Sequence, residues 1–242
     1  MLKEILDFFF PPSCAGCEVR LATGAPRSLC AMCLSRIDTI EAPYCIRCGI
    51  PLEERRDVVR ECFVCLQSPP SFHQARAISR YRAHPDQESD VVASILRRFK
   101  YGLNQQLSRA LSEIVEDRMP LTAGDYDLIV PVPLHVRRLR WRGFNQAALI
   151  AVAVSRRLST RLDVTNLTRV IATKPQTTND FETRRRNVRN AFAVRHPATI
   201  AQRRILLVDD VLTTGATVNE CARVLLGAGA RRVDVLTLAR VI

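Results

Sequence analysis

Two adjacent aspartates, Asp209 and Asp210, directly follow the apolar run ILLV at 205–208. This run predicts a buried strand, and in an open α/β sheet ligands bind beyond the carboxyl ends of the strands. Because two carboxylates would repel a phosphate, we expect them to face a sugar cis-diol, which donates two hydrogen bonds. The simpler alternative is an aspartate that only caps the following helix, but a cap needs one carboxylate and leaves the second unexplained.

A hydroxyl-rich turn follows the aspartates, and a helix is predicted to begin near Ala216 or Thr217. Free backbone N–H groups and the positive end of the helix dipole make such a start attractive to a phosphate dianion. A glycine in the turn lets the backbone approach the anion closely. The sequence therefore predicts a sugar-phosphate site whose turn and helix start comprise Val211, Leu212, Thr213, Thr214, Gly215, Ala216 and Thr217.

Eight of the nine cysteines form Cys-x-x-Cys pairs within the first 65 residues. Each pair presents two thiolates on one tight turn, and two pairs complete a tetrahedron around Zn²⁺. A disulfide scaffold and a redox-active motif are the alternatives, but a reducing cytosol disfavours the first and the fourfold repetition disfavours the second. The predicted zinc ligands are Cys14, Cys17, Cys30, Cys33, Cys45, Cys48, Cys62 and Cys65.

Loop length favours two zinc ions bound in sequential order, the first by the cysteines at 14–33 and the second by those at 45–65. A cross-braced pairing remains open at this point. In either case every ligand is a cysteine and no coordination position stays free. The metal is therefore expected to stabilise structure rather than to perform chemistry.

The chain has 242 residues and a formal net charge of +12; 47% of its residues are hydrophobic and 25% are charged. This is ordinary globular composition and excludes disorder of the whole chain. The apolar run near the start is too short to cross a bilayer and lacks the features of a secretory signal. These observations predict a cytoplasmic protein without membrane insertion.

A Pro/Ser-rich join at 67–71 predicts a boundary between a cysteine-rich domain, 1–68, and a second domain, 72–242. In the second domain apolar strands and amphipathic helices alternate, which predicts an α/β fold with a mostly parallel, doubly wound sheet and flanking helices. The predicted helices are 91–99, 103–115, 147–158 and 217–226, and the predicted strands are 126–133, 164–172, 205–208 and 233–238.

The positive charge is concentrated in residues 135–204, which hold Lys174, fifteen arginines and only three acidic residues. Arginine can clamp a pyrophosphate, or it can follow a nucleic-acid backbone beside an aromatic stacking platform. A solvated basic face is the plainer alternative. A small ligand needs few of these charges, so single-stranded DNA is a candidate partner. The candidate residues are Arg137, Arg138, Arg140, Trp141, Arg184, Arg185, Arg186 and Arg189.

Several sequence blocks together resemble one family. LLVDDVLTTGAT is similar to the phosphoribosyl pyrophosphate signature of type I phosphoribosyltransferases. FFFPPSCAGC, LCAMC, CIRCGIPL, LRRFKYG, VPVPLHVRRLRWRGFNQA and GAGARRVDVLTLAR follow the order of the ComF family of competence-associated proteins. The resemblance covers nearly the whole chain. It implies a double zinc ribbon followed by a type I phosphoribosyltransferase-like domain.

The resemblance also implies roles for single residues. Asp209 and Asp210 would take the ribose 2′- and 3′-hydroxyls, and the threonine turn would hold the 5′-phosphate of phosphoribosyl pyrophosphate bound with Mg²⁺. The turn containing Pro133 and Leu134 matches the pyrophosphate loop, and Arg142 begins the RGFNQ block. Three residues match an element that resembles a mobile flap: Gln176, Arg184 and Asn187.

Two functions follow from the resemblance. One is displacement of pyrophosphate at C1 of the ribose by an unidentified acceptor, with the aspartates positioning the sugar and the cysteine-rich segment forming a wall. The other is a non-catalytic single-stranded-DNA-binding factor for uptake of transforming DNA, with other competence proteins as partners. The two functions are compatible.

Overall fold

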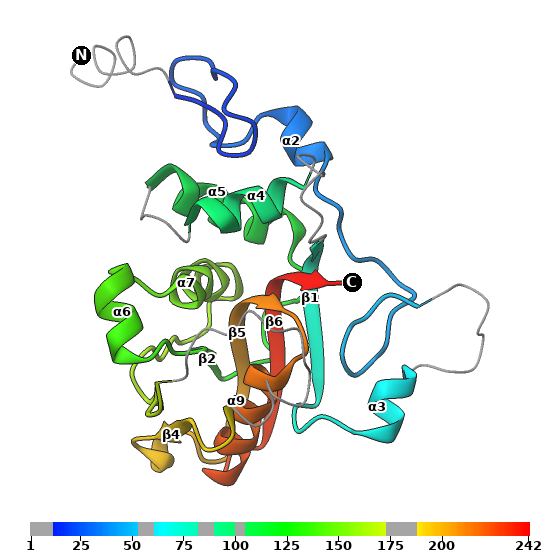
Figure 1. Cartoon of the computed structure of the whole chain (residues 1–242), viewed down its shortest axis with the longest axis vertical. Helices are drawn as coiled ribbons and strands as arrows, with labels where there is room; N and C mark the ends of the chain where they lie inside the picture. Colours follow the sequence, from blue (N-terminus) through cyan, green and yellow to red (C-terminus); the bar gives the residue numbers. More distant parts are fainter. Residues whose placement is uncertain (1–11, 53–60, 82–89, 100–104, 173–187) are drawn as a thin grey trace.

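The computed structural model describes residues 12–52, 61–81, 90–99, 105–172 and 188–242 (Figure 1). Its centre is a sheet with the strand order β1-β6-β5-β2, in which every pairing is parallel. The mostly parallel sheet expected from the sequence is thereby confirmed. Its strands are β1 (Gln74–Tyr81), β2 (Leu128–Pro131), β5 (Arg204–Leu212) and β6 (Arg232–Val241).

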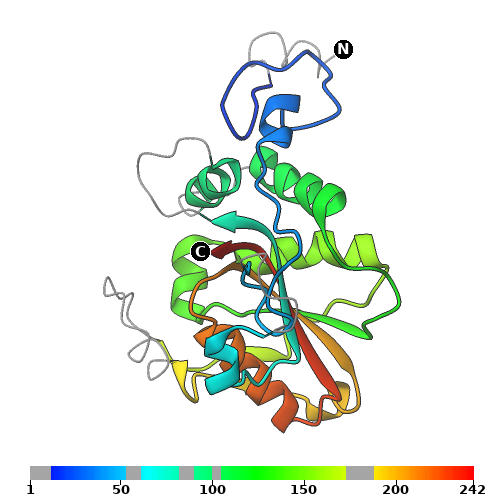
Figure 2. The same ribbon diagram turned by 90° about the vertical axis from the view of Figure 1, so that its right-hand side faces the viewer.

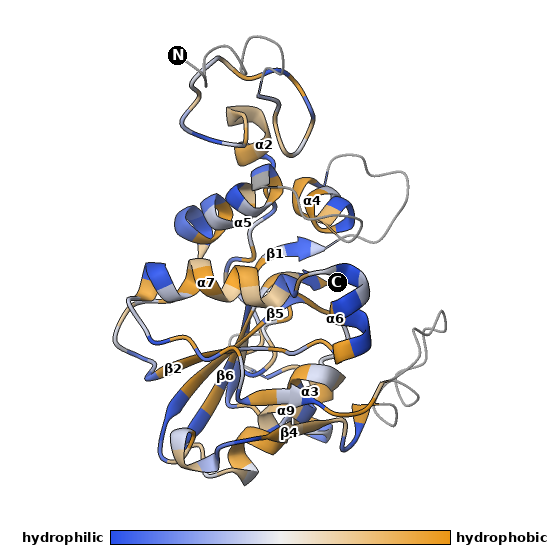
Figure 3. Cartoon of the chain, turned by 90° about the vertical axis from the view of Figure 1, so that its left-hand side faces the viewer, coloured by the Kyte–Doolittle hydropathy of each residue, from blue (hydrophilic) through white to orange (hydrophobic). Residues whose placement is uncertain are grey.

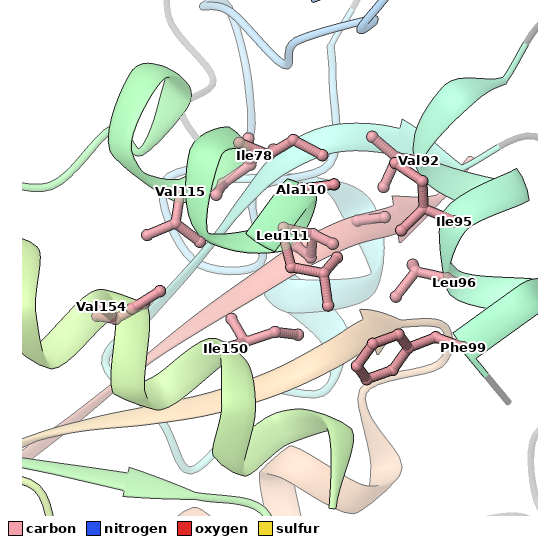
Figure 4. Close-up of a cluster of buried hydrophobic side chains, with 14 of the residues drawn as sticks. Ile78, Val92, Ile95, Leu96, Phe99, Ala110, Leu111, Val115, Ile150 and Val154 are labelled. Carbon is pink, nitrogen blue, oxygen red and sulfur yellow. The ribbon is translucent and has the colours of Figure 1, made fainter. Parts of the chain in front are cut away.

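Helices cover both faces of the sheet because successive residues of a strand point to opposite faces. In β5, Leu206 and Val208 join a hydrophobic cluster with the helices of one face, whereas Ile205 and Leu207 join a second cluster on the other face. Figure 4 shows part of the first cluster. The first face carries α4 (Val91–Phe99), α5 (Gln105–Arg118) and α7 (Gln146–Leu158), and the second carries α9 (Ala216–Gly227).

The smaller elements lie at the ends of the sheet and in the cysteine-rich segment. In the described part of the chain, no helix is both long and apolar enough to cross a membrane. The small elements are α2 (Ala31–Ser35), α3 (Phe63–Gln67), α6 (Val136–Arg142), η1 (Pro197–Thr199) and the antiparallel pair β3 (Leu167–Arg169) and β4 (Phe192–Val194).

All four predicted strands have different bounds in the structure. Those expected at 126–133 and 233–238 are observed as Leu128–Pro131 and Arg232–Val241. The strand expected at 205–208 continues as β5 to Leu212, because Asp209, Val211 and Leu212 still pair with β6. The strand expected at 164–172 is reduced to Leu167–Arg169, because β4, its only partner in the described residues, is itself three residues long. The aspartates therefore lie within a strand rather than in the loop after it.

The two groups of cysteines are attached to different parts of the sheet domain (Figures 1 and 2). The first group lies over α4 and α5, where the Ser28 amide donates to Glu113 at 2.8 Å and Arg98 donates to the Ala15 carbonyl at 2.9 Å. The second group lies beside β1, where the Ala75 amide donates to the Arg47 carbonyl. The predicted boundary at 68–72 stays a prediction.

Candidate functional site

Asp209 and Asp210 line a cavity of about 330 Å³ at the carboxyl end of the sheet. The cavity is closed on one side by the loop after β2 and on another by the start of α7. The side chain of Asn145 donates to the Val132 carbonyl at 3.0 Å, which holds these two segments together. Predicted site residues that line this cavity are Pro133, Leu134, Arg142, Asp209, Asp210, Val211, Thr213 and Thr217.

Local hydrogen bonds fix both carboxylates. Asp209 Oδ1 accepts from the Asp210 amide at 2.9 Å, and Asp210 Oδ1 accepts from the Val211 amide at 2.7 Å. Burial, followed by the neighbouring charge of Asp210, raises the pKa of Asp209 well above its usual range. Neither aspartate forms an ion pair with a described residue. The ionised form of Asp209 is thus disfavoured next to Asp210, and a bound cation or hydroxyl donor would stabilise it.

The threonine turn reaches α9 through Gly215, whose φ of 77° lies in the left-handed region that favours glycine. The Ala216 amide donates to Thr214 Oγ1 at 3.4 Å, and α9 begins there. The next two amides, those of Thr217 and Val218, have no hydrogen-bond acceptor among the described residues. Free amides at the start of a twelve-residue helix are suited to an anion.

A larger cavity, of about 670 Å³, adjoins the same turn. Thr213 lines both cavities, so the turn separates them. The larger cavity has its opposite wall in the second cysteine group, which contributes Cys48, Cys62 and Cys65. Figure 2 shows α3 of this group close to α9. The predicted site residues on this side are Leu212, Thr213, Thr214, Gly215 and Ala216.

The structure groups the cysteines in sequential order. The four Sγ atoms at 14, 17, 30 and 33 all lie within 4.8 Å of one another, and so do those at 45, 48, 62 and 65. The Cys30 amide donates to Cys14 Sγ at 3.3 Å, and the Cys62 amide donates to Cys45 Sγ at 3.2 Å. Burial acts to raise the pKa of Cys14 and Cys45. Hydrogen bonds from backbone amides outweigh this effect and lower the pKa of each thiol to about 7. Thiolate ligands in this arrangement fit Zn²⁺.

Arg142 connects the predicted RGFNQ block to the smaller cavity. Its Nη1 donates to Gln146 Oε1 at 2.8 Å, and its half-buried side chain lines the cavity. Burial and the nearby positive charge of Arg138 lower the pKa of Arg142, whereas Asp210 acts in the opposite direction. The guanidinium group still carries a charge at neutral pH, which is available to an anionic ligand.

The candidate nucleic-acid residues fall into two sets. Those of the first set lie on α6, whose Arg137, Arg138 and Arg140 are exposed beside Trp141, an indole that is 77% exposed. In the second set, Arg189 is exposed and lines the larger cavity. The other candidates of this set, Arg184, Arg185 and Arg186, lie outside the described residues. Gln176 and Asn187 of the proposed flap also lie outside them.

Three further residues line the smaller cavity although no motif pointed to them: Tyr81, Arg169 and Val241. Arg169 belongs to the short strand β3, and its charge acts to lower the pKa of Asp209. Tyr81 and Val241 are the last residues of β1 and β6 and are Cα partners in the sheet. Only the parallel register could have indicated that they end beside the aspartates.

Comparison with known proteins gives two matching family models. The double zinc ribbon domain matches residues 5–66, and the phosphoribosyl transferase domain matches residues 145–241. The fold and the two cysteine groups agree with both. The class is therefore an α/β protein with a phosphoribosyltransferase fold that carries an N-terminal double zinc ribbon, and the cysteine groups support structural zinc.

Full-length relatives define the family more closely. The chain is 34% identical over 235 residues to the DNA utilization protein YhgH of Escherichia coli O6:H1, covering 95% of this chain and 97% of the relative. It is 32% identical to competence protein F of Haemophilus influenzae, with 96% and 98% covered, and 28% identical to competence protein ComFC of Bacillus subtilis, with 88% and 84% covered. The chain belongs to this ComF family, which confirms the resemblance found in its sequence.

Proposed function

We propose that this protein binds phosphoribosyl pyrophosphate together with Mg²⁺ in the smaller cavity and acts in the handling of DNA during competence. One observation carries the ligand assignment: a pair of aspartates and the start of α9 border a single cavity, joined by the threonine turn. The carboxylates suit the two hydroxyls of a ribose. The free amides of Thr217 and Val218 suit its 5′-phosphate.

The arginines and the loop after β2 would hold the pyrophosphate. Arg142 lines the cavity between this loop and the aspartates, and it offers a planar fork to an oxyanion. The oxygen-rich edge formed by Asp209 and Asp210 fits a hard cation such as Mg²⁺. When bound with the ligand, this cation would neutralise the charge that develops on the departing pyrophosphate.

Transfer to an acceptor would displace pyrophosphate at C1 of the ribose. In this reaction the aspartates orient the sugar, while Arg142 stabilises the leaving group and no side chain must act as a general base. We place the acceptor on the side of the larger cavity, because Thr213 borders both cavities and the second cysteine group faces it. Of the cysteine-rich segment, which is expected from the sequence to form a wall of the site, only the second cysteine group would then face the acceptor.

Thermal unfolding with and without phosphoribosyl pyrophosphate and Mg²⁺ tests the binding. The ligand should raise the melting temperature of the unmodified chain, since a ligand that binds only the folded state stabilises it. The double variant Asp209→Asn with Asp210→Asn should lose this increase. Glu41→Gln with Glu116→Gln, which removes two exposed charges far from the cavity, should keep it. An unmodified chain that shows no increase at millimolar ligand would refute the assignment.

Single-stranded DNA binding is the second candidate function. Helix α6 favours it because three exposed arginines surround an exposed indole, which combines phosphate neutralisation with base stacking. The relatives named competence protein F and DNA utilization protein YhgH support a role in DNA handling. Helix α6 contributes Arg138 and Arg142 to the lining of the smaller cavity. Its Arg137, Arg140 and Trp141 do not line the cavity, so they stay available to DNA when a ligand is bound. Binding of a labelled single strand at increasing salt tests this function.

A further inference from the structure

Two pairs of consecutive arginines meet at the amino-terminal end of the sheet. Arg204 of β5 and Arg232 of β6 are Cα partners in the register, and the Arg231 amide donates to the Arg203 carbonyl at 2.9 Å. The distance along β5 from Arg204 to Asp209 is about 17 Å at the usual rise of a strand. The arginines therefore lie at the end of the sheet opposite to the aspartates. Figure 3 shows hydrophilic colouring at this end of β6.

Arg204, Arg231 and Arg232 border a separate open cavity of about 660 Å³. The segment that leads from α3 into β1 forms another part of its wall and contributes His73. None of the described residues that line the cavity is acidic. Its basic lining residues are Arg47, His73, Arg204, Arg231 and Arg232.

Ion pairs hold three of the guanidinium groups in place, those of Arg47, Arg204 and Arg232. Arg204 donates through Nε and Nη2 to Asp127, at 3.2 and 2.9 Å. Arg47 donates through Nε alone to Glu61 at 3.1 Å. Arg204 and Arg47 therefore each keep further N–H donors that have no partner among the described residues. Arg231 forms no ion pair within the described residues, and its side chain is exposed.

His73 lies beside a buried acid. Its Nδ1 lies 3.2 Å from Oδ1 of Asp234, a side chain that is 1% exposed. Oδ2 of the same carboxylate accepts from Tyr126 at 3.1 Å, from Gln74 at 3.0 Å and from Arg232 at 2.9 Å. With Nδ1 turned toward Asp234, Nε2 on the opposite side of the ring points away from this buried network. The His73 side chain is 54% exposed, so this nitrogen is available to a ligand.

We propose that this cavity binds the phosphate group of a phosphorylated molecule. Several guanidinium groups with fixed orientation and spare donors suit a tetrahedral oxyanion, which can accept hydrogen bonds in several directions. Four arginines face three acids, so a positive excess remains. The cavity also has room for a group larger than phosphate. The phosphate is carried either by a free small molecule or by a nucleic-acid strand.

Nuclear magnetic resonance of the zinc-loaded full chain tests the proposal with inorganic phosphate as the probe. The imidazole signals of His73, assigned by comparison with His73→Gln, should shift and saturate as phosphate is added. The double variant Arg47→Ala with Arg231→Ala should bind about tenfold more weakly, because it removes charge-assisted hydrogen bonds to the anion. Arg20→Ala with Arg157→Ala removes two exposed charges outside the cavity and should leave the affinity unchanged.

The outcome is independent of the function proposed for the other end of the sheet. The variant Asp209→Asn with Asp210→Asn should show the same His73 shifts, whether or not the chain binds phosphoribosyl pyrophosphate. Unmoved His73 signals, or equal affinity in the Arg47/Arg231 variant and its control, would overturn the proposal.

Competition identifies the source of the phosphate. Displacement of inorganic phosphate by a 5′-phosphorylated oligonucleotide but not by its 5′-hydroxyl form would identify a strand end. Displacement by both would identify internal phosphodiesters. Displacement by a nucleoside monophosphate alone would identify a free small molecule.

Discussion

Arg240 donates a hydrogen bond of 2.6 Å to the Cys48 carbonyl, and its Nη2 lies 3.6 Å from Cys48 Sγ. The last strand of the sheet is thereby joined to one of the proposed zinc ligands. Because Arg240 is buried, its charge acts on the thiolate with little screening by solvent. This hydrogen bond links the metal-binding segment to the edge of the larger cavity, which both residues line.

The first prediction is that Arg240→Met accelerates zinc loss from the second cysteine group. Residues that support metal ligands typically change metal affinity by about tenfold or more when replaced. Release to a coloured chelator should occur in two phases, and only the phase of the second group should become faster, by about tenfold. Arg240→Lys, which keeps the charge, should restore part of the difference. Equal release from both variants and the unmodified chain would contradict this role.

The second prediction concerns the pH dependence of phosphoribosyl pyrophosphate binding. Since burial raises the pKa of Asp209, this group takes up a proton at a higher pH than an ordinary aspartate. A protonated carboxyl is a weaker partner for Mg²⁺ and for a diol, so affinity should fall as the pH is lowered, and the fall should begin at a higher pH than an ordinary aspartate would cause. Calorimetry measures this change. Asp209→Asn should bind more weakly and lose the part of the pH dependence that Asp209 causes; an unchanged profile would contradict the prediction.

The third prediction concerns stability in acid. Hydrogen bonds from Arg204 lower the pKa of Asp127 to about 2. A carboxyl with a lowered pKa stabilises the folded state above its unfolded pKa, and this contribution is lost as the pH falls through the folded value. Asp127→Asn should therefore lower the melting temperature at neutral pH, and the difference should shrink between about pH 4 and about pH 2. A constant difference across this range would disagree with the ion pair.

The fourth prediction concerns DNA and α6. Arg138→Ala with Arg140→Ala should weaken binding of single-stranded DNA and reduce the slope of affinity against salt, by about 0.7 for each phosphate that the protein no longer neutralises. Trp141→Ala should weaken binding with less effect on the slope, because stacking releases few ions. Arg156→Ala with Arg157→Ala is the matched control, since both residues are exposed on α7. Equal slopes for the two double variants would exclude α6 as the DNA-binding surface.

The sequence predicted those parts of the fold that have a strong local pattern. The run at 205–208 is apolar at every position because the strand is buried on both faces, and the four cysteine pairs carry their own spacing. By contrast, β1 was not predicted, because its sequence QARAISRY mixes charged and small residues. Helix α6 was missed because it has no buried residue and hence no apolar stripe.

The candidate site could be predicted only where one segment supplies it. Asp209, Asp210 and the threonine turn are contiguous, so their chemistry can be inferred from the sequence alone. The larger cavity is different, since it forms between segments more than a hundred residues apart. The arginine cavity is likewise a product of the sheet register, which places Arg204 beside Arg232. Neither arrangement has a signature in one sequence.

The stretch between the two cysteine groups runs along the free side of β1. Thr39 bridges to Ser79, the Ile40 amide donates to Ile78, and the Arg80 amide donates to Asp38. An uncovered strand at the border of a sheet readily recruits strands from other molecules. Cutting away the metal-binding portion would therefore do more than remove zinc. It would expose the unpaired edge of β1, and the remaining α/β domain should aggregate when produced alone.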